Sequence, residues 1–238
     1  MKPSLTLPAS SFQITSIIAV LAAYISPLSE AATVSIANGV QGTFGVSSTD
    51  LGQAAGTSVV LSNGSALYGS SVGRLNDGDI YGGELPVQST HTLITSASGI
   101  VTFNFDLGLN PQGYDISAIT VLTASAQTRT GQAYSVSYAD VNNPLSYVFL
   151  ASLSGSEFGN HDGATEVQSY LTDLNAYNVA SLQFTFANVG EESMFREIDI
   201  SGAASAVPEP GSMFALGGLL ANGLMMRQRR PGAKAGNK

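Results

Sequence analysis

Short segments with period-two alternation, separated by clusters of turn residues, most constrain how this chain can fold. In residues 100–107, Val101, Phe103 and Phe105 alternate with polar residues. Because successive side chains of a strand point to opposite faces, this pattern predicts a strand with one apolar face. Helix signals are nearly absent from this part of the chain. The candidate strands are residues 33–37, 42–46, 58–61, 100–107, 116–122, 133–138, 147–153, 167–171, 181–186 and 195–200.

These segments recur at intervals of roughly ten to eighteen residues, with Gly, Asn, Asp and Ser between them. Such spacing is typical of an all-β, antiparallel sandwich of two sheets. Residues 32–206, about 175 in number, are enough for one domain with a sizeable core. The chain has no cysteine, so the core or a metal ion must stabilise the domain in place of disulfide bonds.

The charge of residues 32–206 is strongly negative. Three arginines (Arg74, Arg129 and Arg196) face fifteen carboxylates, and lysine is absent, which leaves a formal charge of −12. A surface of this kind repels phosphate backbones, so we exclude nucleic acid as a partner. It is compatible with calcium and with neutral polysaccharide.

Residues 207–238 differ from the rest of the chain. Val207, Pro208, Glu209 and Pro210 precede an apolar run over residues 212–226. The prolines keep the motif extended. The run would form a helix about 22 Å long, shorter than the ~30 Å hydrocarbon core, yet snorkelling arginines and a thinned bilayer make a span feasible. The basic residues after it, which place that end in the cytoplasm, are Arg227, Arg229 and Arg230.

This order of motif, apolar helix and basic cluster resembles the PEP-CTERM sorting signal of Gram-negative bacteria, which is also labelled an ice-binding-protein C-terminal domain. The resemblance covers residues 207–230, and residues 231–238 form a polar tail. It implies that an exosortase recognises Pro208-Glu209-Pro210 and cleaves nearby. The passenger, transiently anchored in the inner membrane, would then reach the cell surface or the polysaccharide matrix of a biofilm. A plain membrane anchor without processing is the alternative.

The beginning of the chain carries a second export signal. Lys2 precedes an apolar stretch over residues 14–25, and Ser29 and Ala31 supply small residues at positions −3 and −1. This pattern predicts a secretory signal peptide over residues 1–31 that signal peptidase removes after Ala31. A first transmembrane helix is the alternative, but an apolar run of about 12 residues is short for a span.

Within residues 32–206 a series of short motifs occurs in a distinctive order. The motifs are Leu75-Asn76-Asp77-Gly78-Asp79, Phe103-Asn104-Phe105-Asp106-Leu107-Gly108, Tyr114-Asp115-Ile116, Ile119-Thr120-Val121, Arg129, Gln132, Tyr134-Ser135-Val136-Ser137-Tyr138, Leu182-Gln183-Phe184-Thr185-Phe186 and Phe195-Arg196-Glu197-Ile198-Asp199-Ile200-Ser201-Gly202. Their order resembles the discoidin, or coagulation-factor type C, domain. That resemblance implies a galactose-binding-like jelly roll. Residues 32–74 fit it less well, and the tryptophan that often follows the Asp-Gly loop in that family is absent.

The Asp-Gly turn is a candidate metal site. Asp77 and Asp79, separated by a glycine that permits a left-handed kink, can converge on one hard cation. The resemblance implies a structural Ca²⁺ held by the side chains of Asp77, Asp79 and Glu197 and by the carbonyl groups of Arg74 and Arg196. The alternative is an ordinary turn whose carboxylates face water.

Any ligand-binding groups should lie on loops at one end of the sandwich. Sugar recognition needs a planar side chain that stacks on the ring and polar side chains that bind hydroxyl groups. The candidates are Tyr81, His91, Arg129 and His161, with Tyr114, Phe158 and Asn160 as further loop residues. A salt bridge to a neighbouring strand is an alternative role for Arg129, and packing at a strand edge is the alternative for Tyr114.

The motifs that suggest an enzyme lack their required context. Residues 69–73 match G-x-S-x-G, but a Gly/Ser-rich loop precedes them where a hydrolase has a buried strand. Glu191 and Glu192 are adjacent, and adjacent carboxylates rarely converge on one glycosidic bond. We therefore expect a non-catalytic protein. It is either a carbohydrate- or partner-binding module or a purely structural matrix component without a specific ligand.

Overall fold

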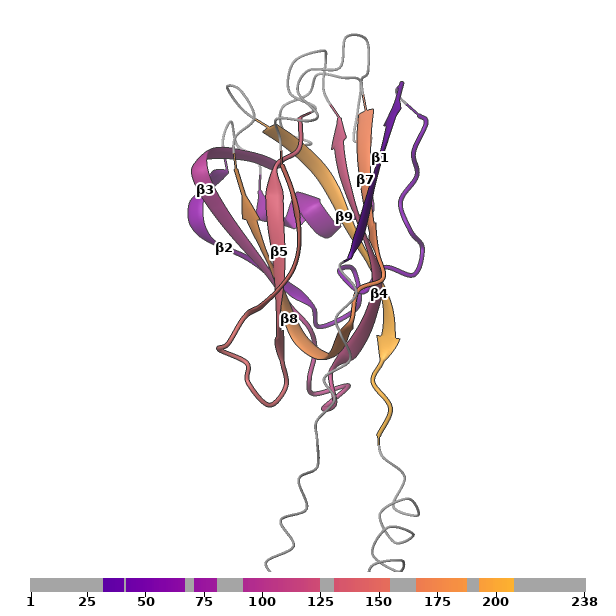
Figure 1. The fold of residues 1–238 in the computed structure, drawn as a ribbon, viewed down its shortest axis with the longest axis vertical. Coiled ribbons are helices and arrows are strands. Elements are labelled where there is room, and N and C mark those ends of the chain that lie inside the picture. Colours follow the sequence, from indigo (N-terminus) through magenta and orange to yellow (C-terminus); the bar gives the residue numbers. More distant parts are fainter. Residues whose placement is uncertain are drawn as a thin grey trace, which may run out of the picture.

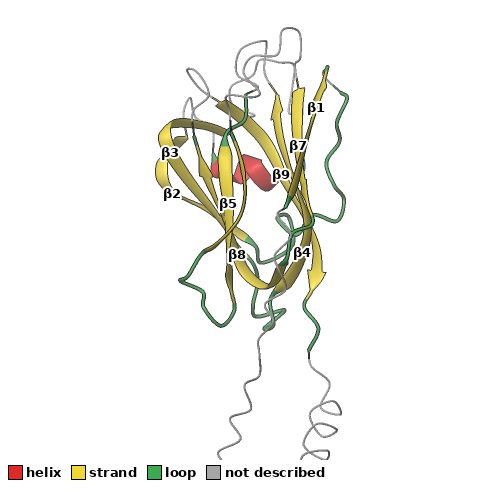
Figure 2. Cartoon of the chain, in the orientation of Figure 1, coloured by secondary structure: helices red, strands yellow, loops and turns green. Residues whose placement is uncertain are grey.

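The computed structural model describes residues 32–40, 42–66, 71–80, 92–124, 131–154, 166–187 and 193–207. These residues form strands and one short 3₁₀ helix, and Figures 1 and 2 show their arrangement. In chain order the elements are β1 (Thr33–Gly39), β2 (Ser58–Ala66), η1 (Val72–Asn76), β3 (Thr92–Asn104), β4 (Tyr114–Ala124), β5 (Tyr134–Asp140), β6 (Val148–Leu153), β7 (Glu166–Thr172), β8 (Ala176–Phe186) and β9 (Ser193–Ala204).

The strands form a continuous antiparallel sheet that folds back on itself. Its order is β1-β7-β4-β9-β3-β8-β5-β6, and β2 adds to β3 outside this path. In Figure 1, β2, β3, β8 and β5 lie on the left and β9, β4, β7 and β1 on the right. β4 also pairs with β8, which joins the two parts of the sheet. The prediction of an all-β, antiparallel sandwich is confirmed, but its two predicted sheets are hydrogen-bonded into one continuous sheet.

The core is apolar and draws side chains from both parts of the sheet. Val101 and Phe103 are fully buried and Phe105 is nearly so, which confirms the apolar face predicted from their alternation. The rings of Phe103 and Phe184 meet edge to face with centroids 5.7 Å apart, a favoured geometry for aromatic pairs. Other fully buried core side chains are Leu75, Ile119, Val121, Val136, Leu171, Val179, Leu182, Phe195, Ile198 and Ile200.

One predicted strand, residues 42–46, is wrong. Gly42 has a φ of +89°, and the Glu166 carboxylate accepts the N–H groups of Gly42 at 2.9 Å, Thr43 at 3.2 Å and Phe44 at 3.3 Å. Because a side chain binds these N–H groups, they are not available to a neighbouring strand. The segment is therefore a loop fastened to the start of β7.

The end of β3 also differs from the prediction of a strand over residues 100–107. β3 begins at Thr92 and ends at Asn104. Two residues later the Asp106 carboxylate accepts the N–H groups of Gly108 at 2.8 Å and Leu109 at 3.2 Å. An aspartate that binds the backbone two residues on favours a turn over a strand.

The pairing register gives the sandwich two distinct ends. At one, which we call the loop end, Ala124 pairs with Glu166, Thr92 with Phe195, and Tyr134 with both Leu153 and Phe186. The strand ends there flank residues 81–91, 125–130, 155–165 and 188–192. At the opposite end, which we call the terminal end, Tyr114 pairs with Ala204 and Val179.

Both terminal signals lie outside the described residues, apart from Val207. That residue follows β9 and is 70% exposed. In the part of the chain that the structure describes, no helix has the length and apolar character needed to span a membrane.

Candidate functional site

Arg196 is the most deeply buried cation among the described residues, and it lies at the loop end. Its side chain, on β9, is fully enclosed. Its Nη1 donates to the carbonyl of Ile80 at 2.9 Å and its Nε to the carbonyl of Ala124 at 3.5 Å. Ile80 and Ala124 directly precede residues 81–91 and 125–130. One buried guanidinium therefore binds the last described residue before each of these two segments.

A second buried polar network holds the same end of the sandwich. The side-chain amide of Gln132, which is fully buried, donates to the carbonyl groups of Val121 at 3.1 Å and Val167 at 2.9 Å. Its oxygen accepts from the Ser169 hydroxyl at 2.6 Å. That hydroxyl lies 2.5 Å from the Tyr134 hydroxyl. A satisfied network of this kind makes the surrounding strands rigid.

The predicted ligand-binding residues belong to the segments that these networks flank. Tyr81, His91, Arg129 and His161 lie outside the described residues, as do Phe158 and Asn160. Tyr114 is described, at the terminal end.

The side chain of Tyr114 is part of the core and is not available to stack on a sugar. It is 5% exposed, and its ring packs against Phe105 with centroids 5.1 Å apart. Its hydroxyl accepts from Asn110 Nδ2 at 2.5 Å. The interpretation of Tyr114 as a packing residue is confirmed.

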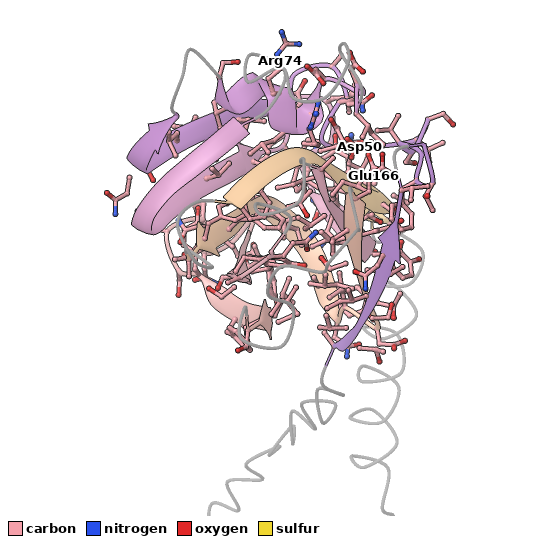
Figure 3. All side chains as sticks on the ribbon, turned by 90° about the horizontal axis from the view of Figure 1, so that it is seen from above. Asp50, Arg74 and Glu166 are labelled. Atoms are coloured by element: carbon pink, nitrogen blue, oxygen red, sulfur yellow. The ribbon has the colours of Figure 1, made fainter. Side chains whose placement is uncertain are left out.

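Three buried carboxylates form a cluster against β9. Glu197 and Asp199 are two residues apart on this strand and so face the same side. Asp50 joins them (labelled in Figure 3) from a segment that runs along β9. There, Leu51 N–H donates to the Ile200 carbonyl at 2.8 Å, and Ile200 N–H donates to Asp50 Oδ1 at 2.6 Å. One oxygen from each carboxylate lies within 4.8 Å of the others, and all three residues are buried.

Burial and mutual repulsion shift the titration of this cluster. Desolvation, and then the charges of Asp199, Asp50 and Asp77, raise the pKa of Glu197 to about 8, although a hydrogen bond from Gln53 opposes the shift. Desolvation and the charge of Asp50 raise the pKa of Asp199 to about 6. Burial also raises the pKa of Asp50, against the hydrogen bonds that it accepts from the backbone.

The structure brings Glu197 to the Asp-Gly turn. Gly78, with a φ of +75°, donates its N–H to Glu197 Oε2 at 3.3 Å. Asp77 Oδ2 forms a salt bridge of 2.8 Å with Arg74, and Asp77 Oδ1 accepts the N–H of Asp79 at 3.0 Å. The predicted calcium set of Asp77, Asp79 and Glu197 stays a prediction.

Asp50 and Asp199 are the functional candidates that sequence reasoning missed. Asp199 could have been recognised, because it lies two residues after Glu197 on a predicted strand and therefore on the same face. Asp50 had no such signal, because it and Ile200, whose N–H it binds, are 150 positions apart in the chain.

Comparisons with known proteins give structural neighbours only. No family model and no curated protein match the chain. The family 32 carbohydrate-binding module of NanJ from Clostridium perfringens, solved with galactose, aligns with a TM-score of 0.44 and 14% identity over 64% of this chain and 97% of that one. An F5/8 type C domain from Bacteroides fragilis aligns with a TM-score of 0.40 and 16% identity over 63% and 93%. A module from a C. perfringens family 31 glycoside hydrolase gives 0.43 and 12% over 64% and 96%.

Proposed function

We propose that residues 32–206 form a non-catalytic carbohydrate-binding module, exported by a signal peptide and sorted to the cell surface or matrix by an exosortase. The observation that carries the proposal is the buried Arg196, which fastens the residues before two of the loops at one end of the sandwich. Loops on a rigid scaffold are the usual place for binding groups. These loops carry the aromatic and polar candidates Tyr81, His91 and Arg129.

The direction in which the chain leaves the sandwich supports this role. Ser205 N–H donates to the Gly113 carbonyl at 2.9 Å, and β9 ends opposite Tyr114 at the terminal end. The sorting motif that follows therefore begins at the opposite end from the candidate binding loops. A chain anchored through residues 212–226 would direct the loop end away from the membrane.

The chemistry of the domain favours an uncharged ligand. A formal charge of −12 over residues 32–206 repels acidic polymers, whereas neutral sugars approach without an electrostatic penalty. Stacking on Tyr81 and hydrogen bonds from Arg129 would suit a hexose with adjacent hydroxyl groups. Galactose, the sugar bound in one of the compared structures, is the first ligand to test.

A glycan array with the purified full-length chain, run with calcium and with chelator, tests this function. We expect binding to neutral glycans with a Kd of about 1 mM or tighter, equivalent to a binding free energy of about −4 kcal/mol or more favourable. Tyr81→Ala and Arg129→Ala should each weaken that binding at least roughly tenfold, equivalent to about 1.4 kcal/mol.

Tyr177→Ala is the matched control. Tyr177 is a tyrosine with 58% exposure in β8 at the terminal end, so its removal should leave binding unchanged. The proposal fails if no neutral glycan binds, or if Tyr177→Ala has the larger effect.

A structural matrix component without a ligand is the second candidate. It is favoured by exposed apolar side chains on and beside β6, the last strand of the sheet path: Leu145 at 95%, Val148 at 49% and Phe149 at 62%. An exposed, apolar edge strand can pair with other copies. Self-association of the purified chain, together with an empty glycan array, would favour this role.

A further inference from the structure

Each carboxylate of the Asp50, Glu197 and Asp199 cluster already binds N–H groups, but two oxygens of the cluster have no hydrogen-bond partner among the described residues. Asp50 Oδ1 accepts the N–H of Gly52 at 2.8 Å as well as that of Ile200. Asp199 Oδ2 accepts the N–H of Ser47 at 2.8 Å. Asp50 Oδ2 and Asp199 Oδ1 are fully buried and accept no hydrogen bond from any residue that the structure describes. A buried carboxylate oxygen without a partner costs free energy, so native structures rarely leave one unpaired.

The described residues around the cluster do not neutralise its charge. Asp50 is 6% exposed, Asp199 is 4% exposed and Glu197 is fully buried, so water does not screen their repulsion. The only salt bridge found among the described residues joins Arg74 to Asp77. The guanidinium of Arg196 instead donates to the carbonyl groups at the loop end.

The spacing of the oxygens suits one large, hard cation. Ca²⁺ binds oxygen ligands at about 2.3–2.6 Å, so two ligands on opposite sides of the ion are about 4.6–5.2 Å apart. One oxygen from each of the three carboxylates lies within 4.8 Å of the other two, which fits this limit. Mg²⁺ requires a tighter octahedron and releases its water reluctantly.

We propose that Asp50, Glu197 and Asp199 form a Ca²⁺ site, in which the unpartnered oxygens Asp50 Oδ2 and Asp199 Oδ1 are ligands. This set differs from the predicted one, because Asp50 and Asp199 take the places given to Asp77 and Asp79. The ion offsets the mutual repulsion of three buried carboxylates. This Ca²⁺ site shares no residue with the proposed sugar-binding loops.

The site explains how the beginning of the domain is held to its end. Asp50 belongs to the segment of residues 47–52, which contacts β9 through Ser47, Leu51 and Asp50 itself. The side-chain amide of Gln53 extends this contact, because it donates to Glu197 Oε1 at 3.3 Å. A cation here fastens the chain before β2 to the last strand, and its loss should loosen that segment first.

Calorimetric titration and thermal melting of the purified full-length chain with CaCl₂ or MgCl₂ at pH 7.5 test the site. We expect one Ca²⁺ per chain and a melting temperature higher by roughly 5–10 °C at a hundredfold excess over Kd, with Mg²⁺ much less effective. Asp50→Asn and Asp199→Asn should each weaken Ca²⁺ affinity at least tenfold. Both variants keep the oxygen that accepts backbone N–H groups, so melting in chelator checks that they fold.

Two control variants separate this site from the alternatives. Asp106→Asn changes another aspartate that binds the backbone two residues on, and it should keep the full response. Asp77→Asn should keep most of it. The proposal is overturned if Asp77→Asn abolishes binding while Asp50→Asn and Asp199→Asn retain it. It is equally overturned if the parent shows no response to Ca²⁺, because protons alone would then hold the cluster. Glycan binding is measured separately, so neither result depends on the sugar site.

Discussion

At the scale of single residues, buried charges hold this domain together through the backbone. Arg196 binds carbonyl groups before two loops, and Glu166 binds three N–H groups of the loop after β1. Asp50 binds the N–H groups of Gly52 and Ile200. Each side chain is buried, so each hydrogen bond to a charged group is worth more than one at the surface.

Arg196 should be worth more to stability than any exposed arginine. Arg196→Met would remove the hydrogen bonds that the carbonyl groups of Ile80 and Ala124 accept from a buried charged group, and we expect it to lower the free energy of unfolding by about 2–4 kcal/mol. Arg74→Met is the control, because that side chain is 42% exposed and its ion pair should contribute about 1 kcal/mol or less. Urea denaturation of both variants checks the difference. Equal losses would show that Arg196 does not fasten the loops.

The carboxylate cluster gives the metal-free protein a distinctive pH dependence. A carboxylate whose folded pKa is raised stabilises the fold below its unfolded pKa, and that stability is lost as the pH rises through the folded value. With the pKa of Glu197 raised to about 8 and that of Asp199 to about 6, the melting temperature in chelator should fall between pH 5 and pH 8.

Asp199→Asn should reduce this fall, because it removes one charge of the cluster and its repulsion of Glu197. Asp106→Asn should show the same fall as the parent. Melting curves at half-unit steps of pH check both variants. A melting temperature that rises between pH 5 and pH 8 would contradict the pKa directions.

At the scale of secondary structure, local patterns predicted the strands where side-chain burial follows the period of two. The pattern failed at residues 42–46, where a distant carboxylate, Glu166, takes the backbone N–H groups. It failed again after Asn104, where Asp106 starts a turn. In both places a carboxylate accepts backbone N–H groups that would otherwise pair with a neighbouring strand. The strand propensity of the local sequence does not account for a hydrogen bond of this kind.

The candidate metal site likewise contains residues that the sequence predicted and residues that it did not. Glu197 was predicted, because the resemblance to the discoidin domain implies that a glutamate of the last strand joins the Asp-Gly turn. Asp50 was not predicted, because only the folded chain brings the segment before β2 against β9.

The alternation in β3 makes a quantitative prediction. Phe103 is fully buried against Phe184, so Phe103→Ala should leave a cavity and cost about 3–5 kcal/mol. Val60→Ala on the neighbouring strand β2 is the control, because Val60 is 47% exposed, and it should cost about 1 kcal/mol or less. Chemical denaturation of the two variants measures both costs. Similar losses of stability in the two variants would contradict the assignment of Phe103 to the buried face and Val60 to the exposed one.

At the scale of the whole molecule, the end of β9 and the loop end lie at opposite ends of the sandwich. β9 ends at Ala204 beside Tyr114, whereas Ala124, Leu153 and Phe186 end their strands at the loop end. A sorting signal in the residues that follow β9 would therefore begin at the end of the sandwich opposite the loop end.

Processing at both ends is the prediction for the mature protein. Mass spectrometry of surface or matrix material should find a chain that begins near Ala32 and, where an exosortase is present, lacks the helix after Pro210. The intact terminus Lys238 on the surface protein would contradict exosortase processing but would leave the signal peptide untouched. A chain that begins at Met1 would contradict the signal peptide.

The position of bound sugar on the sandwich tests the central claim most directly. We suggest an amide NMR titration of the ¹⁵N-labelled chain with galactose or with the tightest neutral glycan from the array. The account predicts shifts at amides that flank the loop end, such as Ala124, Tyr134 and Phe186, and none at Tyr114, Val179 and Ala204. Shifts confined to the terminal end, or none at saturating sugar, would contradict it.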